Sequence, residues 1–470
     1  MNKFYSFDKE GFWFSAKFLA VFFCLLAIFY FGSGSVFAKI FPQKFDISQI
    51  EENLENILAR KKFEENMKKI LASEKEVQDL FEKTRNIKIY SISDYIPREG
   101  KFIGVDLEEM KLYLYQNGEI DNTFEILSKG KEGTYYETPS GLYKIITKEK
   151  NHFSSIGKVF MPNSMQFFGN FYIHGWPYYP DGTPVRAGYS GGCIRLSDKD
   201  AQKVFDFSEK GTEIFVYEEK NDIVSEAVKL KNISKPEISA ESFIVADIDS
   251  GEIFLEKNPE QILPIASISK LMTAVVANET ISFDKKIING ETFSVGDLLY
   301  PLIMQSDNGV ADSLAMFYGA NAFVQWMNDK AKALSMDNTN FNDSSGLSSY
   351  NTSTVLDLFR LSRYLKNKRS FILNISKEPQ KDIIASSGRD YKIINLNPFS
   401  ENENFIGGKT GYTETAGETM LSTFSVPIGQ EENVNLAIIV LGSEGRQKDT
   451  LALLDWFKKA RVCDEEIVLG

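Results

Sequence analysis

YSGGCIRL, residues 189–196, decides how the N-terminal half of this 470-residue chain is organised, because it sets a cysteine among glycines and directly before an arginine. Cysteine attacks carbonyl groups as the thiolate, so a catalytic cysteine needs a nearby base or positive charge and a backbone that a substrate can approach closely. Gly191 and Gly192 supply such a backbone, and Arg195 supplies the charge. Cys193 is therefore a candidate nucleophile.

The base has to come from another part of the chain, which has two histidines. His174 ends the aromatic, strand-like run FYIH and precedes Gly175, so we expect its ring at the end of a strand, 19 residues before Cys193. We expect His174 to lower the pKa of Cys193 and to make it the most reactive thiol. The alternative is that Cys193 is a small buried hydrophobic residue, the usual role of a free cysteine.

A His-Gly pair, a loop of this length and then SGGCIRL resemble the catalytic stretch of L,D-transpeptidases of the YkuD type. The segments ETPSGLY, residues 137–143, and MPNSM, residues 161–165, fall where that family carries similar turns. The resemblance covers roughly residues 100–218. Many members have histidine directly before the Gly-Cys pair, where this chain has Gly191.

This resemblance implies a role for each residue of the stretch. Cys193 is the nucleophile, His174 is the general base, and backbone N–H groups near Gly192 and Cys193 form the oxyanion site. Arg195 either binds a carboxylate or braces the loop. The substrate class implied is a peptidoglycan stem peptide.

A second set of motifs begins after a strand hairpin expected over residues 243–247 and 251–255. The stretch SISK places Ser267 three residues before Lys270, and on a helix this spacing puts both side chains on one face. The lysine amine can then reach the serine hydroxyl and help remove its proton. Ser267 is the second candidate nucleophile.

Two further motifs follow in order, Ser-Asp-Asn from Ser306 to Asn308 and Lys-Thr-Gly from Lys409 to Gly411. With Ser-x-x-Lys they resemble the serine penicillin-recognising enzymes. Segments around these motifs, such as NFNDSSGL at 340–347, are most similar to D-alanyl-D-alanine carboxypeptidases, and the likeness runs from about residue 239 to 460.

This second resemblance implies that Ser267 is the nucleophile and Lys270 its base. It also implies that Ser306 relays protons and that the substrate is bound by Asn308, Lys409, Thr410 and Gly411. β-Lactams are expected to inhibit this site.

Two features of the second half leave alternatives open. Class A β-lactamases deacylate with a glutamate between the last two motifs, and the ENEN segment at 401–404 matches on paper, but it lies five residues before Lys409, which is too late in the chain. Only 39 residues separate Ser267 from Ser306, fewer than expected for most such carboxypeptidases, so the segment from Asn278 to Val295 is shortened. A cell-wall binding or scaffold protein with one degenerate site is the alternative from another class.

The composition of the chain gives no support to nucleic-acid binding, a disulfide-stabilised fold or a metal site. A net charge of −12 gives no indication of nucleic-acid binding. The three cysteines, Cys24, Cys193 and Cys463, are too widely spaced to predict a disulfide framework or a metal site. The resemblances imply no metal and no organic cofactor.

The N-terminal region is expected to direct the chain out of the cytoplasm. Residues 18–38 carry no charge and are long enough to span a bilayer, and VFA at 36–38 also suits a signal-peptide cleavage site. A cleaved signal peptide and a single-pass membrane anchor both remain open. We expect the rest of the chain at the outer face of the cytoplasmic membrane, in the cell wall or in the periplasm.

Two other segments connect these parts. Apolar residues recur at three- and four-residue steps from Asp46 to about Arg85, which predicts an amphipathic helix, either a stalk or a helix packed on its neighbour. The charged segment at 219–240, with Pro236 and few apolar residues, predicts a linker whose ends would lie roughly 25 Å apart as a flexible coil.

The sequence therefore predicts a multidomain α+β protein. Its expected parts are a signal peptide or membrane anchor, a helical spacer, a β-rich L,D-transpeptidase domain, a linker and an α/β domain like serine penicillin-binding proteins and β-lactamases, at residues 1–38, 39–99, 100–218, 219–240 and 241–465. The expected function is a bifunctional peptidoglycan enzyme, an L,D-transpeptidase and a serine D-Ala-D-Ala carboxypeptidase. Such an enzyme would act in cell wall biogenesis and cell shape.

Overall fold

The structure, a computed structural model, describes residues 91–218, 228, 230–428 and 433–461. These residues belong to one compact unit, Glu82–Gly470. We call residues 100–218 the cysteine domain and residues 241–461 the serine domain. The expected membrane segment and the helix expected from Asp46 lie outside the described residues. Among the helices that the structure does describe, none has the length and apolar character needed to cross a membrane.

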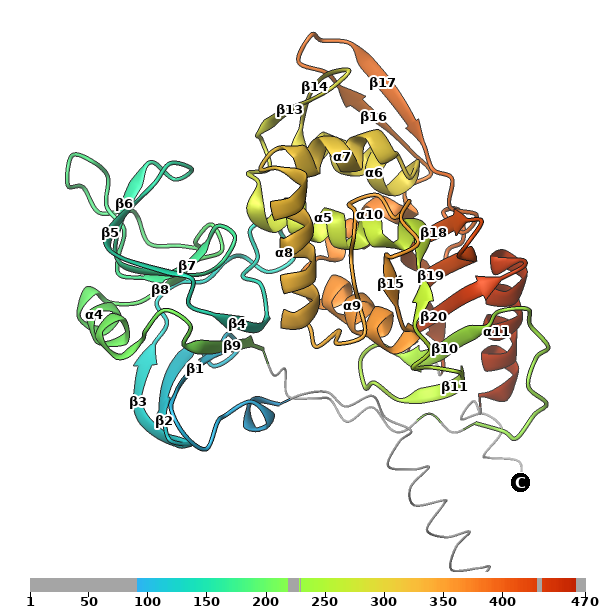
Figure 1. The fold of residues 1–470 in the computed structure, drawn as a ribbon, viewed down its shortest axis with the longest axis horizontal. Helices are drawn as coiled ribbons and strands as arrows, with labels where there is room; N and C mark the ends of the chain where they lie inside the picture. Colours follow the sequence, from blue (N-terminus) through green and yellow to red (C-terminus); the bar gives the residue numbers. More distant parts are fainter. Residues whose placement is uncertain (1–90, 219–227, 229, 429–432, 462–470) are drawn as a thin grey trace, which may run out of the picture. The chain divides into compact units, whose positions relative to one another are not determined.

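The cysteine domain is built from two β-sheets and a helix (Figure 1). The first sheet has the strand order β3-β2-β1-β9-β4 and the second has the order β5-β6-β7-β8. The strands are β1 (Lys101–Asp106), β2 (Lys111–Gln116), β3 (Glu119–Glu125), β4 (Gly141–Lys144), β5 (Thr147–Ser154), β6 (Val159–Phe168), β7 (Phe171–His174), β8 (Ile194–Arg195) and β9 (Glu213–Tyr217). Helix α4 (Asp198–Phe207) lies between β8 and β9, and a 3-10 turn, η1 (Ile92–Asp94), precedes β1.

Local sequence explains how the first sheet is assembled. The turn between β2 and β3 holds Asn117 and Gly118 at φ 55° and 86°, the left-handed conformation that this residue pair favours in a tight hairpin. Strand β9 pairs in parallel with β1, and residues such as Ile103 and Val216 are fully buried between the sheet and the rest of the domain. The β-rich character expected for this region is confirmed.

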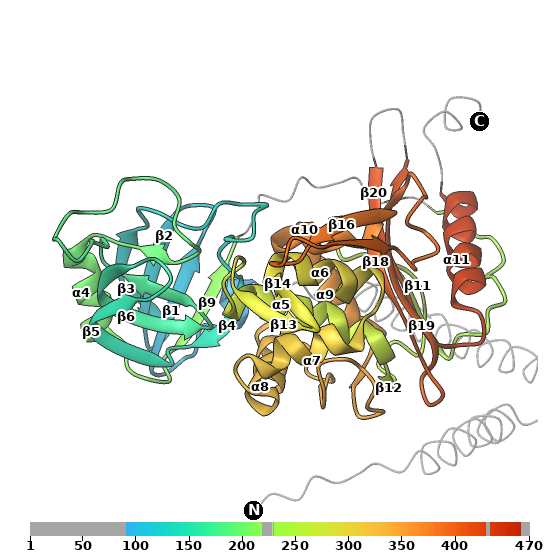
Figure 2. The same cartoon turned by 90° about the horizontal axis from the view of Figure 1, so that it is seen from above.

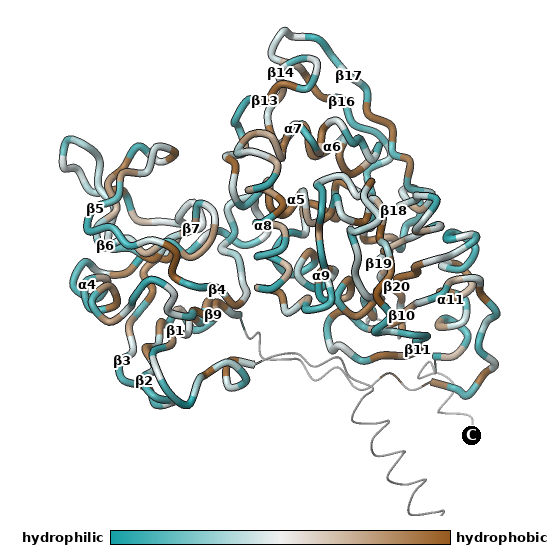
Figure 3. The backbone as a smooth tube through the Cα atoms, viewed as in Figure 1, coloured by the Kyte–Doolittle hydropathy of each residue, from teal (hydrophilic) through white to brown (hydrophobic). Residues whose placement is uncertain are grey.

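The serine domain is organised around an antiparallel sheet with the order β11-β10-β20-β19-β18. Its strands are β10 (Ser242–Asp247), β11 (Ile253–Lys257), β18 (Phe405–Thr413), β19 (Gly417–Pro427) and β20 (Asn433–Ser443). Successive side chains of a strand point to opposite faces. Accordingly Ile244 and Ile439 pack into one core and Val245 and Val440 into another, so both faces are apolar, and Figure 3 shows the brown stretches along β10 and β20.

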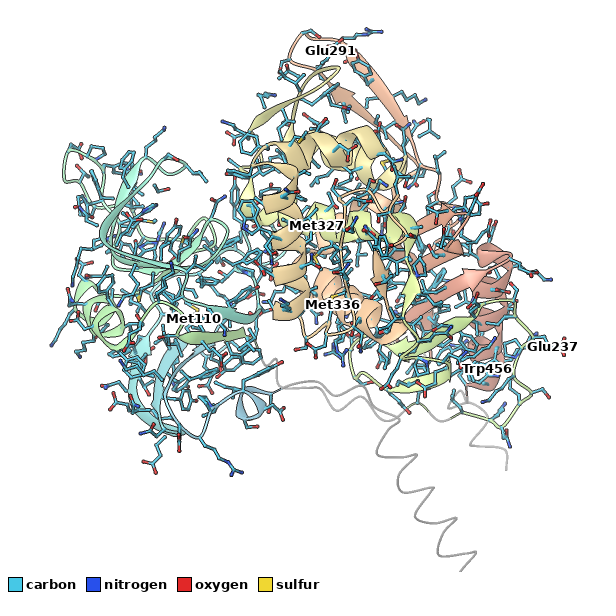
Figure 4. All side chains as sticks on the ribbon, viewed as in Figure 1. Met110, Glu237, Glu291, Met327, Met336 and Trp456 are labelled. Atoms are coloured by element: carbon cyan, nitrogen blue, oxygen red, sulfur yellow. The ribbon has the colours of Figure 1, made fainter. Side chains whose placement is uncertain are left out.

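Helices cover both faces of this sheet. Helix α11 (Arg446–Ala460) packs on one face through residues such as Trp456, while the remaining helices, including α8 with Met327, lie on the other (Figures 2 and 4). These helices are α5 (Ser269–Thr280), α6 (Val295–Met304), α7 (Asn308–Met316), α8 (Ala320–Ala333), α9 (Val355–Lys368) and α10 (Ser370–Lys377), with the 3-10 turn η2 (Ala266–Ile268) before α5. Three short hairpins or bridging pairs complete the domain: β12 (Leu263–Pro264) with β15 (Thr352–Ser353), β13 (Lys286–Asn289) with β14 (Glu291–Ser294), and β16 (Gln380–Ile384) with β17 (Asp390–Ile394).

The C-terminal part of the expected linker is fixed on the serine domain. Leu230 packs against the core beneath α11, and the backbone N–H of Lys231 donates to the carbonyl of Ala460 at 2.6 Å. At the end of the segment, the Asp449 carboxylate accepts a hydrogen bond from the N–H of Ala240 at 2.9 Å. The estimate for a flexible coil therefore does not apply to this part. Residues 219–227 and 229 lie outside the described residues.

Candidate active sites

Strand pairing places the two expected residues of the cysteine site on neighbouring segments of one sheet. Strand β7 pairs in parallel with β8, and His174 lies opposite Arg195. Neighbouring strands are about 4.8 Å apart, so β8 lies beside the last residues of β7, and Cys193, which immediately precedes β8, lies near Tyr172. The long loop between His174 and Cys193 thus leaves and returns to one edge of the second sheet.

His174 is buried and holds a defined orientation. Its Nδ1 lies 2.6 Å from the carbonyl oxygen of Gly175, an acceptor, so Nδ1 carries the proton and Nε2 has a free lone pair. Burial lowers the pKa of His174 to about 4, although the hydrogen bond to Gly175 acts to raise it. At neutral pH the ring is therefore uncharged and can accept a proton.

Cys193 is half-buried, and its thiol donates a hydrogen bond to the backbone carbonyl of Asn170 over 3.7 Å. Burial raises the pKa of Cys193 to about 11, although the backbone N–H of Tyr172 and the charge of Arg195 act to lower it. The expectation that His174 lowers this pKa is wrong, because an uncharged imidazole gives no electrostatic stabilisation to the thiolate. At neutral pH both the Cys193 thiol and the His174 ring are therefore uncharged.

Gly192 lies in the loop that carries the nucleophile, at φ +106°. A Cβ at this position would lie 2.2 Å from the Phe171 ring, so only glycine fits. Its N–H donates to Ser190 Oγ at 3.0 Å, and its carbonyl accepts from Thr138 Oγ1 at 2.9 Å. The N–H of Gly192 is thus already used within the loop, which leaves that of Cys193 as the candidate for the oxyanion site.

Arg195 brings a positive charge to the cysteine site, but this charge does not offset the effect of burial on the pKa of Cys193. Its guanidinium lies 5.7 Å from the centre of the Trp176 ring, and burial lowers its pKa. Among the residues that the structure describes, no hydrogen-bond partner faces its buried Nε and Nη1. Two N–H donors of this side chain are therefore unpaired within the described residues.

The serine site is assembled at the start of α5. Ser267 lies in the turn η2, and Lys270 follows in the first turn of α5. Lys270 Nζ donates to Ser267 Oγ at 2.9 Å and to Asn308 Oδ1 at 2.7 Å. The expected contact between the two side chains of Ser-x-x-Lys is present, and Asn308 joins it from α7.

Lys270 is buried, which changes its proton affinity. Burial lowers the pKa of Lys270 to about 8, although the carboxylates of Asp343, Asp307 and Asp312 act to raise it. About one lysine in ten is then uncharged at pH 7, against fewer than one in a thousand for an ordinary lysine. A lysine of this kind can take a proton from a serine hydroxyl.

Ser306 immediately precedes the cap of α7. Its backbone has φ 58°, a left-handed conformation that is uncommon for a residue with a side chain and that costs on the order of 1–3 kcal/mol. The carboxylate of the next residue, Asp307, caps the helix by accepting from the N–H of Val310 at 3.0 Å. This cap directs Asn308 to the Lys270 amine, and Ser306 lies two residues away along the chain.

The Lys-Thr-Gly segment runs along strand β18 beside the nucleophile. A Cβ on Gly411 would lie 2.9 Å from the backbone nitrogen of Ser267, so the strand passes directly against the turn η2. Lys409 is buried and donates to the Thr410 carbonyl at 2.9 Å. Burial holds its pKa well below the usual range, and Arg446, which donates to the Gly411 carbonyl at 2.8 Å, acts in the same direction.

Some residues of the serine site are not identified by sequence motifs. The Ser345 carbonyl accepts a hydrogen bond from Lys270 Nζ, and the Asp343 carboxylate holds this loop by accepting from the N–H of Ser345 at 2.8 Å. Asn351 Nδ2 donates to the Asp343 carbonyl at 3.0 Å. The segment NFNDSSGL carries part of the resemblance, but its contact with Lys270 is made through the Ser345 backbone carbonyl and has no signature in residue type.

Two family models match the chain, one over each domain. Residues 100–216 match the YkuD family, the L,D-transpeptidase catalytic domain. Residues 229–288 and 282–445 match the Peptidase_S11 family, D-alanyl-D-alanine carboxypeptidase. Both domains thus match families of enzymes that act on peptidoglycan.

Curated relatives cover about half of the chain. The D-alanyl-D-alanine endopeptidase of Escherichia coli is 30% identical over 267 residues, which cover 51% of this chain and 84% of that protein. The enzyme of the same name from Pseudomonas aeruginosa is 32% identical over 253 residues, covering 48% of this chain and 79% of that protein. Among solved structures, penicillin-binding protein D2 from Listeria monocytogenes in its ampicillin-bound form is 28% identical, with a TM-score of 0.42 and coverage of 48% of this chain and 99% of that one. Through its serine domain the chain belongs to the D-alanyl-D-alanine carboxypeptidase family, and it carries an L,D-transpeptidase catalytic domain ahead of that domain.

Proposed function

We propose that the cysteine site cleaves D-Ala from a tetrapeptide stem and transfers the remaining acyl group to an amine of a neighbouring stem. Cys193 Sγ attacks the carbonyl carbon of the L-centre residue before D-Ala, the bond to the D-Ala nitrogen breaks, and His174 carries the thiol proton to the departing amine. The acceptor amine then attacks the thioester, and its proton returns through His174 to the departing thiolate. The neutral state of His174 at pH 7 supports this role.

Arg195 is proposed as the ligand of a substrate carboxylate in this site. The two unpaired N–H groups of its buried side chain support this role over that of a brace for the loop. A guanidinium binds a carboxylate through two parallel hydrogen bonds, which fixes its orientation as well as its position. The Cys193 N–H would bind the oxygen on which charge develops during attack.

The serine site is proposed to cleave the peptide bond after a D-Ala residue. Ser267 Oγ attacks the D-Ala carbonyl carbon, Lys270 accepts the hydroxyl proton, and water hydrolyses the ester that forms. The observation that carries this proposal is the 2.9 Å hydrogen bond between Lys270 Nζ and Ser267 Oγ, with the pKa of the lysine lowered to about 8. Lys409 and Thr410 would bind the terminal carboxylate of the stem, and Ser306 would relay protons to the departing amine.

The group that leaves distinguishes two reactions of this site. In a carboxypeptidase it is a terminal D-Ala, and in an endopeptidase it is a cross-linked neighbouring stem. We propose carboxypeptidase activity as the main reaction, as the family implies. Endopeptidase activity is the second candidate, since relatives with 30% and 32% identity carry that name.

The location and the inhibitors follow from the same proposal. The uncharged segment at 18–38 supports export, with this segment as a cleaved signal peptide or a single-pass anchor. The catalytic domains would then face peptidoglycan at the outer side of the cytoplasmic membrane. β-Lactams would acylate Ser267, because they present a carboxylate and a strained amide to the same groups.

Mass spectrometry of muropeptides tests the assignment of the two nucleophiles. We expect Cys193→Ala to abolish D-Ala release from tetrapeptides and to leave the trimming of pentapeptides unchanged. Ser267→Ala should have the opposite effect, since the two sites share no catalytic side chain. Loss of both activities from either folded variant would contradict the assignment. Cross-linked dimers added to the same assay separate endopeptidase from carboxypeptidase activity by the products formed.

A further inference from the structure

The turn between β6 and β7 in the cysteine domain lies against the C-terminal end of α5 in the serine domain. Asn170 makes two hydrogen bonds there: its backbone N–H donates to the Glu279 carbonyl at 3.3 Å, and its Nδ2 donates to the Thr280 carbonyl at 2.7 Å. Carbonyl groups at the end of a helix have no partner within the helix. Asn170 therefore supplies a donor to the Glu279 carbonyl and a second donor to the Thr280 carbonyl.

The approach of the two domains at this turn is close enough to require glycine. Gly169 has φ +47°, and a Cβ added there would lie 2.4 Å from the Glu279 carbonyl oxygen and 3.1 Å from Thr280 Cγ2. Any larger residue would push the turn away from the helix.

The other side of the same turn faces the nucleophile. The Asn170 carbonyl accepts the hydrogen bond from the Cys193 thiol, and the Tyr172 N–H acts on the same sulfur. His174 follows two residues later, on the same side of strand β7, because side chains alternate along a strand. The strand that begins at this turn thus carries the base and two backbone groups that hold the thiol.

A second route connects the same end of α5 with the catalytic loop. Tyr135 OH donates to the Ile281 carbonyl at 2.9 Å, and Asn278 Nδ2 donates to the Tyr135 carbonyl at 3.0 Å. The next residues, Tyr136 to Thr138, contact Gly192 directly through the hydrogen bond from Thr138. Both segments that surround Cys193 are therefore held by one helix end.

We propose that the serine domain is a structural part of the cysteine site: the C-terminal end of α5 positions the turn at Gly169 and Asn170, and through it the Cys193 thiol and strand β7. Asn170 is a positioning residue in this account, because it acts on the reaction through Cys193. The segment from Asn278 to Val295, which the sequence indicated to be shortened, contains the groups that make this contact. The inference rests on the proposed role of Cys193 as nucleophile. It adds that the two catalytic domains do not act as independent modules.

The test compares two glycine variants of the full chain. Gly169→Ala places a methyl group against the Glu279 carbonyl, while Gly182→Ala is a matched control, since Gly182 has φ +86° and nothing within 4 Å of the added Cβ. Both variants carry the backbone strain of a left-handed alanine, and only one touches the serine domain. Fluorescent penicillin labelling of Ser267 reports that the serine domain is folded in each.

We expect Gly169→Ala to reduce D-Ala release from tetrapeptides by about tenfold or more, because displacement of catalytic groups by an ångström is enough for such a loss. The apparent pKa of Cys193, obtained from the pH dependence of its alkylation rate, should fall below about 11 towards that of an ordinary thiol, because the sulfur becomes less enclosed. Gly182→Ala should match the wild-type protein in both measurements. Tyr172 and Arg195, which act electrostatically on the sulfur, are unchanged in these variants.

Asn170→Ala covers the case in which Gly169→Ala does not fold. It leaves no carbonyl without a partner at Thr280, which also accepts from Tyr318 OH at 3.1 Å, and we expect a smaller loss in the same direction. Asn151→Ala, in an exposed part of the same domain, is its control. Wild-type rates in both Gly169→Ala and Asn170→Ala, or an equal loss in the controls, would overturn the proposal. Failure of the wild-type protein to release D-Ala would contradict the proposed function instead, and the alkylation profile would still measure positioning.

Discussion

Burial shifts the pKa values of the reactive groups in the two sites in opposite directions, although each group has to lose a proton before it can act. Burial raises the pKa of Cys193 to about 11, so the thiolate is a minor species at neutral pH. Burial lowers the pKa of Lys270 to about 8, so the uncharged amine that can accept the Ser267 proton becomes the major species above about pH 8. The reaction rate of each site should therefore depend on pH in its own way.

The pH dependence of Cys193 alkylation by iodoacetamide measures the pKa of its thiol. Because the thiolate reacts and the pKa is raised, the rate should increase about tenfold per pH unit from pH 7 to 10. The Cys193→Ala variant corrects for labelling of Cys24 and Cys463. A rate that levels off near pH 7 would show a lowered pKa and would contradict this account of the resting site.

The pH dependence of Ser267 acylation by a fluorescent penicillin reports the pKa of Lys270. The rate should rise as Lys270 loses its proton and should level off above about pH 8. Lys270→Arg, which keeps the charge and does not lose its proton, should reduce the rate at every pH and remove this dependence. A wild-type rate that is constant from pH 6 to 9 would exclude Lys270 as the base.

At the scale of elements, a buried ionic network joins α5, α8 and the loop between α9 and α10. The Glu279 carboxylate lies 2.9 Å from both Lys330 Nζ and Arg369 Nη2, and these side chains are fully buried. Lys330 also donates to Tyr143 OH of the cysteine domain at 2.7 Å. The network thus includes the helix end that contacts the Asn170 turn.

Removal of one charge from this network should destabilise the protein strongly. We expect Lys330→Met to lower the free energy of unfolding by about 3–5 kcal/mol, because Glu279 loses a partner that it cannot replace with water. Lys332→Met, two residues further on an exposed position of the same helix, should change it by about 0.5 kcal/mol or less. Denaturant unfolding of the full chain measures both, and equal values for the two variants would show that the network does not contribute.

Most of the individual elements could be predicted from the sequence, whereas this contact between domains could not. The hairpin at Asn117-Gly118, the strand at 243–247 and the contact between Ser267 and Lys270 all depend on residues close in sequence, whose spacing determines which side chains share a turn or a face. The Asn170 contact joins backbone carbonyls of α5 to a turn more than 100 residues earlier, and backbone groups have no signature in residue type. The raised pKa of Cys193 was missed for a related reason, since burial depends on the tertiary fold.

At the scale of the whole molecule, the two activities are expected to act in sequence. The carboxypeptidase reaction produces a tetrapeptide stem, which is the donor that the cysteine site needs. Two sites on one chain raise the local concentration of that product at the cysteine site to around the millimolar range. Fusion of the domains would then increase the flux beyond that of two separate enzymes.

A mixture of variants that each lack one site tests whether fusion increases the flux, and it does so with full-length chains. Equimolar Cys193→Ala and Ser267→Ala proteins contain both activities, but never both on one molecule. At low enzyme concentration we expect the wild-type protein to form 3→3 cross-links from pentapeptides faster than the mixture does. Equal rates would show that the fusion only exports two independent enzymes together.

The most direct test of two sites acting in order is the formation of 3→3 cross-links from peptidoglycan that contains only pentapeptide stems, measured by mass spectrometry. The wild-type protein should form them, Cys193→Ala should stop at tetrapeptides, and Ser267→Ala should leave pentapeptides intact. Addition of tetrapeptide stems should restore cross-linking by Ser267→Ala. Cross-links made by either variant from pentapeptides alone would contradict the account.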